Sequence, residues 1–222
     1  MSIKESLSHT PGVALVAALL VSAGCAPKAP PLSGAVAPVA LPRSELQPGY
    51  RRIIFTWNYR DADYNLRGDG AARVSPPDSA RFDFFLPNGM GTHAVLIGGD
   101  LRAPGPDFLK NLLPPPEMLW AALGRLALGS AQPADTIVRV DGDTLRADIS
   151  SLQGGGEEIW RVAFSNGILT KLDLIEGGRI QEWVSRQRNG DVSYRHERAG
   201  RKLEIRITRV ERIAELDETI WR

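Results

Sequence analysis

The stretch ILTKLDLIEGGRIQEWVSRQRNGDVSYRHERAGRKLEIRITRVE, residues 168–211, decides the fold. Apolar and polar residues alternate along four runs, which are separated by the pairs Gly-Gly at 177–178, Asn-Gly at 189–190 and Ala-Gly at 199–200. Alternation with a period of two is typical of a strand with one buried face. Such pairs between alternating runs mark hairpin turns. The stretch therefore predicts an antiparallel meander and not parallel strands joined by helices.

The same pattern continues toward the N-terminus. In residues 51–59, Ile53, Phe55, Trp57 and Tyr59 fall on one face of a predicted strand. Residues 65–74 are rich in Gly and Ala, which suits a strongly curved strand or a close approach of backbone. Further strands are predicted at residues 80–86, 92–97, 136–140, 144–149 and 158–165.

One segment in the middle of the chain has helical periodicity. Pro116 and Glu117 suit a first helical turn, and Gly129 is a suitable stop. An apolar face is formed at helical spacing by Met118, Leu119, Ala122, Leu123 and Leu126. Such a helix can pack on a sheet or bind a membrane, and we favour packing. The predicted fold is mainly β (α+β): a curved, incompletely closed barrel of about ten antiparallel strands, with one helical segment packed in or across it.

The only cysteine, Cys25, directly follows an apolar segment. Residues 13–21 form a run of Val, Ala and Leu, which is too short to cross a bilayer but has the length of a signal-peptide core. The small residues Ser22, Ala23 and Gly24 separate this run from the cysteine. A buried structural cysteine is the alternative, but it explains neither the apolar run nor the proline-rich sequence that follows.

Residues 22–25 resemble the lipobox of bacterial lipoproteins, although Ser22 stands where an aliphatic residue is usual. The resemblance implies that residues 1–24 are a signal peptide, and that Cys25 is acylated and becomes the N-terminus. It also implies a membrane partner reached through the acyl chains, which hold a protein on a bilayer without spanning it. Ala26 follows the cysteine in place of the Asp that retains such proteins at the inner membrane, so the implied location is the outer membrane, facing the periplasm.

A proline-rich segment links the cysteine to the rest of the chain. Residues 26–42 contain five prolines and almost no charge, so they favour extended polyproline II. We therefore divide the chain into a signal peptide at 1–24, an acylated cysteine and tether at 25–43, and a folded domain at 44–222. Fully extended, the tether could reach roughly 50 Å from a membrane.

The order of strands, one helix and a long meander, closed by a tail with Leu216, Asp217 and Trp221, resembles the LolA/LolB superfamily of lipoprotein carriers and receptors. The resemblance implies an unclosed barrel whose apolar cavity binds lipoprotein acyl chains or another apolar ligand. It also implies that Met90, on the loop matching a family loop of the receptor branch, faces the membrane. The candidate cavity-lining residues are Phe55, Trp57, Phe82, Phe84, Leu119, Leu123, Trp160 and Trp183.

No pattern of catalytic chemistry stands out. The net charge is +1 and acids are interleaved with the C-terminal arginines, so no nucleic-acid partner is expected. His93 and His196 have no neighbours at metal-ligand spacing, and nucleophile-elbow, P-loop and dinucleotide motifs are absent from the sequence. We therefore expect neither an enzyme, nor a metal site, nor a cofactor, although a composite site assembled from distant residues stays open.

Two main hypotheses follow from the sequence. In the first, a membrane-anchored lipoprotein binds lipid, acyl chains or another apolar ligand, with a role in lipoprotein or envelope-lipid handling. In the second, a non-enzymatic envelope lipoprotein has a filled core and binds a protein partner. The two differ in the interior of the barrel, because only the first requires an apolar void.

The lipobox resemblance generates a direct test at Cys25. Replacing Cys25 by Ser removes the thiol that would accept the lipid, so we expect unprocessed precursor and loss of labelling by a palmitate analogue. Labelling is read by gel fluorescence and processing by mass spectrometry. Undiminished labelling of the Cys25→Ser chain would show that the cysteine is not the lipid attachment site.

Overall fold

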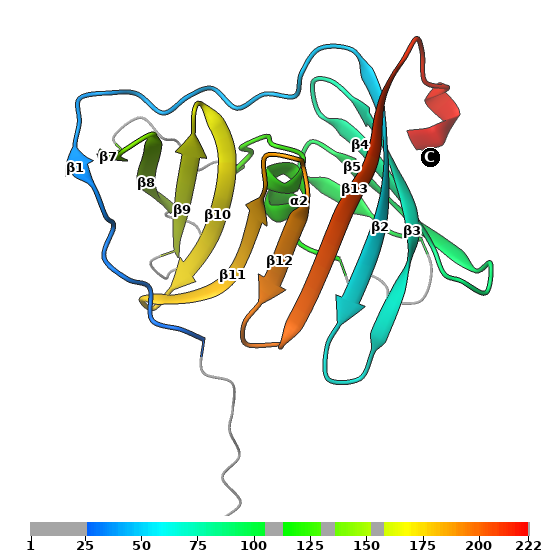
Figure 1. The fold of residues 1–222 in the computed structure, drawn as a ribbon, viewed down its shortest axis with the longest axis horizontal. Coiled ribbons are helices and arrows are strands. Elements are labelled where there is room, and N and C mark those ends of the chain that lie inside the picture. The colour runs from blue at the N-terminus through cyan, green and yellow to red at the C-terminus, as the bar shows by residue number, and fades with distance from the viewer. Residues whose placement is uncertain (1–25, 105–112, 130–135, 152–157, 222) are drawn as a thin grey trace, which may run out of the picture.

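The structure, a computed structural model, describes residues 26–104, 113–129, 136–151 and 158–221. These residues form one antiparallel sheet of 13 strands that curves around a short helix (Figure 1). The strands are β1 (Ala35–Val36), β2 (Tyr50–Arg60), β3 (Asn65–Ser75), β4 (Ser79–Phe85), β5 (Gly91–Ile97), β6 (Asp100–Arg102), β7 (Val138–Asp141), β8 (Thr144–Ser151), β9 (Glu158–Ser165), β10 (Ile168–Glu176), β11 (Arg179–Arg186), β12 (Val192–His196) and β13 (Arg201–Ile213). The helices are α2 (Pro116–Ala122) and a 3₁₀ turn, η2 (Glu218–Trp221).

The spatial order of the strands joins the two halves of the chain. The order is β1-β7-β8-β9-β10-β11-β12-β13-β2-β3-β4-β5-β6, so the last strand pairs with the first long one. Strands β1 and β6 form the two ends of the sheet, which is not closed. The predicted antiparallel, incompletely closed barrel with one helix is confirmed. The number of strands is larger than the predicted ten or so, because β1 and β6 also join the sheet. Both are too short to show an alternating pattern in the sequence.

The turns between the strands lie along two opposite edges of the sheet. Because neighbouring strands run in opposite directions, the turns at residues 61–64, 86–90, 177–178 and 197–200 lie along one edge, here named the lower edge (Figure 1). The turns at the other ends of the strands, among them residues 187–191, lie along the upper edge.

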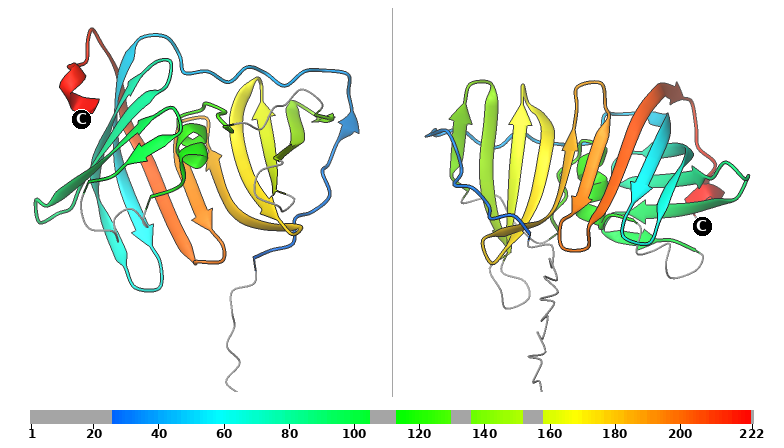
Figure 2. Two further views of the ribbon diagram at one scale, coloured as in Figure 1. Left: turned by 180° about the vertical axis from the view of Figure 1, so that it is seen from behind. Right: turned by 60° about the horizontal axis from the view of Figure 1, so that its bottom comes forward.

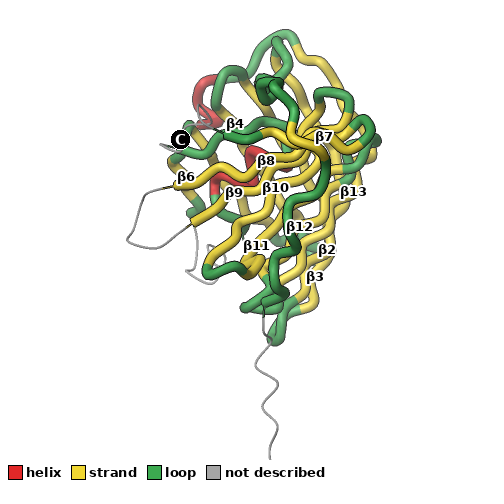
Figure 3. Tube along the Cα trace, turned by 90° about the vertical axis from the view of Figure 1, so that its left-hand side faces the viewer, coloured by secondary structure: helices red, strands yellow, loops and turns green. Residues whose placement is uncertain are grey.

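Helix α2 lies on the concave side of the sheet and packs against β10 and β11 (Figure 2). Viewed from the β7 end, it lies within the curve of the strands (Figure 3). Four consecutive residues, Met118 to Ala121, are buried, as expected of a helix covered on several sides. The helix ends earlier than predicted, because Gly124 adopts φ +88° and its N–H bonds to the Ala121 carbonyl, while the Arg125 N–H reaches that of Trp120. This Schellman motif stops the helix before Gly129.

Two glycines of β3 make room for the aromatic side chains of β2. Gly70 lies opposite Phe55 and Gly68 opposite Trp57. A methyl group on Gly70 would overlap the Phe55 ring, and one on Gly68 would overlap the carbonyl of Phe85. The Phe84 ring of β4 then contacts both aromatic neighbours edge-on, with centroids 5.8 Å from Phe55 and 5.7 Å from Trp57. The close backbone approach predicted for residues 65–74 therefore serves aromatic packing.

The segment predicted to be a free tether lies against the folded body from Ala26 onward. It runs past the β7 end of the sheet and returns across the upper edge to β2 (Figure 1). Backbone hydrogen bonds join Ala29 to Gly178 and Pro27 to Ile180, and β1 pairs with β7. Just beyond this segment, Leu46 is buried in the core. We name residues 26–37 the N-terminal strap.

Three arginines on the sheet hold the strap by its carbonyl groups. Arg179 donates to Ala26 at 2.8 Å, Arg161 to Pro30 at 2.7 Å, and Arg139 to Gly34 at 3.0 Å. Proline has no N–H for pairing in a sheet, so a side-chain donor to the Pro30 carbonyl complements a residue that can only accept.

None of the helices within the described residues has both the length and the apolar character needed to cross a bilayer.

The glycine of β3 that faces Trp57 generates a stability test. Gly68→Ala forces a methyl group against the Phe85 carbonyl, so we expect the free energy of unfolding to fall by about 1–3 kcal/mol. Gly99→Ala is the matched control, because a methyl group there meets no atom within 4 Å, and we expect a change of at most about 0.5 kcal/mol. Urea unfolding followed by circular dichroism measures both variants, and equal stabilities would contradict the steric role of Gly68.

Candidate functional site

Two cavities lie on the concave side of the sheet. The lower pocket has a volume of about 210 Å³ and is lined by apolar and aromatic side chains near the lower edge. Its walls include Trp57, Tyr59, Leu66, Phe84, Met90 and Leu203. Met90 is 60% exposed, so the lower pocket reaches the surface at the turn between β4 and β5.

The lower pocket is built from inward-facing positions of four strands. Tyr59 of β2 lies opposite both Leu66 of β3 and Leu203 of β13, so these three side chains share one face. Phe84 of β4 adds its ring from the next strand. Since all four positions are close to turns of the lower edge, the pocket opens where the strands end.

Polar groups are few in the lower pocket. The Tyr59 hydroxyl donates to a carboxylate oxygen of Asp61 at 2.7 Å, and burial followed by this hydrogen bond raises the pKa of Tyr59. His93 also lines the pocket, and partial burial with the nearby Arg81 guanidinium lowers the pKa of His93. His93 lies opposite Asp83 in the pairing of β4 with β5, next to the ion pair of Asp83 with Arg81.

The upper pocket lies near the opposite ends of the same strands and has a volume of about 220 Å³. Phe55, Phe82 and Leu123 line it, together with Arg51 and Arg186. The edge-on contacts of Phe84 with Phe55 and Trp57 lie between the two pockets. Among the described residues, these aromatic contacts separate the lower pocket from the upper one.

The structure distributes the predicted cavity residues among several places. Trp57 and Phe84 line the lower pocket, and Phe55, Phe82 and Leu123 line the upper one. Met90, predicted to face the membrane, lines the mouth of the lower pocket. Leu119 and Trp160 lie in the core and line neither pocket.

Trp183 was expected in the cavity but lies on the outer face of the sheet. Its neighbour Val184 is buried on the concave side, so the period of two turns Trp183 outward. Lys171 and Arg195 approach its ring at 5.7 and 6.0 Å, and its indole donates to Glu197 at 2.7 Å. The prediction for this residue was therefore wrong, because it rested on side-chain type and not on strand phase.

Trp120 is an interior residue that the sequence reasoning missed. It is 1% exposed, and its indole N–H donates to the carbonyl of Gly98 at 2.6 Å. This bond ties α2 to the turn between β5 and β6. The available signal was the run of four apolar residues from 118 to 121, which is typical of a helix buried on several sides.

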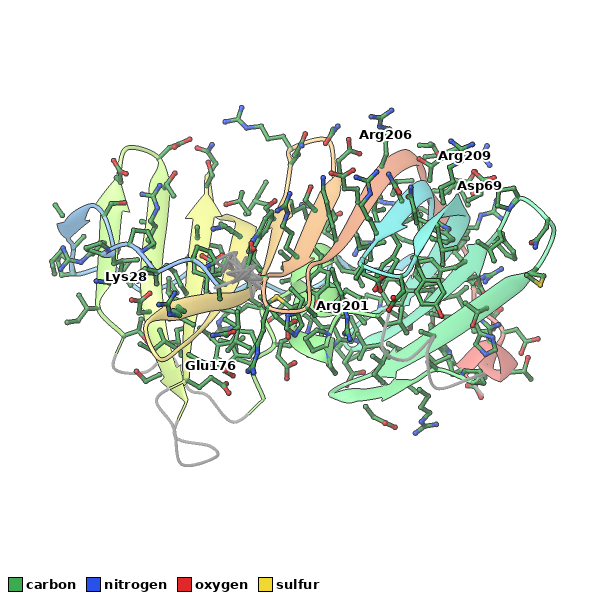
Figure 4. The ribbon with its side chains drawn as sticks, turned by 90° about the horizontal axis from the view of Figure 1, so that it is seen from below. Lys28, Asp69, Glu176, Arg201, Arg206 and Arg209 are labelled. Atoms are coloured by element: carbon green, nitrogen blue, oxygen red, sulfur yellow. The ribbon has the colours of Figure 1, made fainter. Side chains whose placement is uncertain are left out.

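The outer face of β13 and β2 is charged. Arg206 and Arg209 of β13 point away from the side that holds α2, and Asp69 lies on the same outer side (Figure 4). Seen from below, Lys28 and Glu176 lie at one end of the lower edge and Arg201 near its middle (Figure 4). Charges of both signs therefore lie on the outer face and along the lower edge.

Neither His93 nor His196, the histidines among the described residues, forms part of a metal cluster. Within the described residues, no group of three His, Cys, Asp or Glu side chains could hold a metal ion. His196 lies 3.6 Å from Glu182, which also accepts a hydrogen bond from Tyr194 at 2.8 Å. Cys25 and the lipobox residues Ser22, Ala23 and Gly24 lie outside the described residues.

Comparisons with known proteins identify neighbours in fold. No protein-family model matches the sequence, and no curated protein matches it. A LolA superfamily protein from Nitrosomonas europaea has a similar structure, with a TM-score of 0.47, 9% identity, and coverage of 78% of this chain and 90% of that one. A DUF1329 family protein from Desulfovibrio piger matches with a TM-score of 0.44 and 9% identity, over 78% of this chain and 89% of that one.

A third neighbour is an outer membrane lipoprotein-sorting protein domain from Vibrio parahaemolyticus, with a TM-score of 0.37, 10% identity, and coverage of 78% and 89%. Similarity at this level concerns the fold alone.

Trp120 and Trp183 together provide a test of the interior. Trp120→Phe leaves the Gly98 carbonyl without its donor in a buried place, so we expect the free energy of unfolding to fall by about 1–3 kcal/mol. Trp183→Phe also loses one hydrogen bond, but on the outer face, and we expect a loss below about 1 kcal/mol. Chemical unfolding compares the variants, and a larger loss at Trp183 would contradict the assignment of the two faces.

Proposed function

We propose that this chain is a lipid-anchored envelope protein whose half-barrel binds an acyl chain or a similar apolar ligand in the lower pocket. The observation that carries the proposal is the pocket itself: it has aromatic and aliphatic walls, few polar groups, and a mouth beside the exposed Met90. Apolar side chains that leave space beside them make a cavity that water occupies poorly, so an apolar ligand fits it.

The size of the lower pocket restricts the ligand. Its volume of about 210 Å³ is smaller than the roughly 300–1,000 Å³ of typical small-molecule sites. We therefore propose that it takes a segment of one chain, with the remainder of the ligand outside. Each methylene group removed from water contributes about 0.8 kcal/mol, so affinity should rise with chain length until the pocket is full.

Membrane attachment is the second part of the proposal. It places the anchor at Cys25 after removal of residues 1–24, and the protein at the outer membrane facing the periplasm. The support is the lipobox-like sequence and the apolar run before it. Binding without chemistry, and so no enzymatic activity, is part of the same proposal.

A second candidate function is the binding of a protein partner through the outer face. A hollow of about 570 Å³ crosses β2, β3, β12 and β13 there, and polar side chains including Asn58, Arg67, Asp69 and Glu204 line it. The occupation of much of the concave side by α2 favours this alternative as well. The two candidate functions can be distinguished by measuring ligand binding, because the binding of a protein partner requires no apolar ligand.

The proposed function can be tested by a substitution that fills the lower pocket. Leu66→Trp places an indole in the cavity, and we expect capture of a neutral photoactivatable long-chain alcohol by the full chain in membranes to fall about tenfold, equivalent to about 1.4 kcal/mol of binding free energy. Adducts are counted by mass spectrometry of peptides that contain Tyr59, Met90 or Leu203.

Arg67→Trp is the matched control, because residue 67 is adjacent on β3 and faces the outer hollow. Its capture of the alcohol should equal that of the wild type. Equal capture by Leu66→Trp, or adducts confined to the outer face, would contradict binding in the lower pocket and favour the partner-binding alternative.

A further inference from the structure

The upper pocket contains arginine side chains on the side of the sheet where apolar residues are expected. Arg51 precedes the inward set Ile53, Phe55, Trp57 and Tyr59 by the same period of two, so it too faces inward. Arg186 is two residues beyond the buried Val184 and is inward for the same reason. Both side chains line the upper pocket.

These cations have no acidic partners among the described residues. The ion pairs of nearby arginines involve other positions: Arg52 pairs with Glu211 on the outer face, and Arg188, at the rim, has Asp143 at 4.0 Å. For Arg51 and Arg186, the part of the chain that the structure describes supplies no ion pair. The Nε atom of Arg51 is buried and has no hydrogen-bond acceptor within the described residues.

The surroundings of Arg51 make the lack of an acceptor costly. Arg212 lies directly opposite it on β13, so a second guanidinium group is its cross-strand neighbour. Burial lowers the pKa of Arg51 below its ordinary value, and the positive charges of Arg186 and Arg212 lower it further. Burial alone lowers the pKa of Arg186, with no carboxylate acting in the opposite direction. A buried donor with like charges around it lacks the acceptor that such groups normally have.

The remainder of the upper pocket is apolar. Phe55, Phe82, Leu123 and Ile207 form walls adjacent to the arginines in a volume of about 220 Å³. Gln47, Arg188 and Asn189 complete the polar part of the lining, so no carboxylate among the described lining residues would repel an anion from within the pocket. Cationic donors therefore border an apolar cavity.

We propose that the upper pocket binds an anionic amphiphile, with its carboxylate or phosphate group on Arg51 and Arg186 and its alkyl chain along Phe55, Phe82 and Leu123. Guanidinium groups donate two parallel hydrogen bonds to either oxyanion. Such a ligand supplies the acceptor that the Arg51 Nε lacks and neutralises the repulsion among the three arginines. Its alkyl chain contacts the apolar walls, with which a free inorganic anion would make no contact.

A purely structural explanation assigns a different role to the same side chains. Arginine can bury its aliphatic stem along apolar surface while the charged group remains in water. In that case, replacing the guanidinium group would not change affinity for any anion. Both arginines are half-buried, so this explanation accounts for terminal nitrogen atoms that reach water, but it leaves the buried Nε of Arg51 without an acceptor among the described residues.

The test uses two probes with the same tail and different heads. Octanoate and octan-1-ol are titrated by calorimetry into the full chain in non-ionic detergent micelles, with empty micelles as the blank. We expect octanoate to bind the wild type more tightly than octanol, and Arg51→Gln combined with Arg186→Gln to weaken octanoate about tenfold to hundredfold while leaving octanol unchanged. Hexyl phosphate should behave as octanoate does.

Arg52→Gln is the matched control, since Arg52 is the next residue along β2 but pairs with Glu211 on the outer face. It should leave octanoate binding unchanged. The melting temperature of the Arg51→Gln, Arg186→Gln chain should equal or exceed that of the wild type, because the change removes unpaired like charges. A marked fall would mean that the arginines are structural and would overturn the proposal.

Three other outcomes would also overturn it: equal binding of octanoate and octanol by the wild type, no effect of the double substitution on octanoate, or inorganic phosphate binding as tightly as hexyl phosphate. The last would indicate a site for a free anion without a tail. Capture of the neutral alcohol in the lower pocket is measured separately, at Tyr59, Met90 and Leu203. The proposal for the upper pocket and the proposed function of the lower pocket can therefore be contradicted independently.

Discussion

The pairing of β13 with β2 is the interaction on which the rest of the structure depends. It joins residues 201–213 to residues 50–60, from opposite ends of the folded part of the chain, and makes two separate meanders into one sheet. Closing so long a loop costs conformational entropy before other contacts form. Both pockets use this pairing, because Leu203 and Tyr59 meet across it in the lower one, and Ile207 and Phe55 in the upper.

The concave side shows how the same curved sheet becomes two cavities. Gly68 and Gly70 allow the rings of Trp57 and Phe55 to lie close to β3, and Phe84 then packs between them from β4. Without a side chain on those glycines the sheet can curve tightly, and the aromatic group divides the space along the strands. The lower half is left apolar, while the arginines give the upper half a different chemistry.

Much of this fold could be predicted from local sequence patterns. Alternation and turn pairs identified the long strands and the meander, because both reflect geometry within a few residues. The β13–β2 pairing has no local signal, and neither do the short strands β1 and β6. For the site, aromatic type suggested Trp57 and Phe84, which line the lower pocket, but it failed for Trp183, whose position in the strand alternation turns it outward.

Arg51 illustrates the converse case. Its position in the alternating set of β2 indicates an inward direction, yet its charge favours an outward assignment when type alone is considered. Residue type describes what a side chain prefers, whereas strand phase describes where the backbone directs it. The two disagree at Arg51, Arg186 and Trp183, and the backbone decides each case.

The N-terminal strap changes what an anchor at Cys25 can do. Ala26 is 7% exposed and its carbonyl is bonded to Arg179, next to the turn at residues 177–178. Consecutive Cα atoms are about 3.8 Å apart, so an acylated Cys25 would have almost no slack. The folded body of a chain attached in this way could not move far from the membrane surface. It would rest with its lower edge against the lipid headgroups, and a ligand could pass between the bilayer and the mouth beside Met90 without crossing open water.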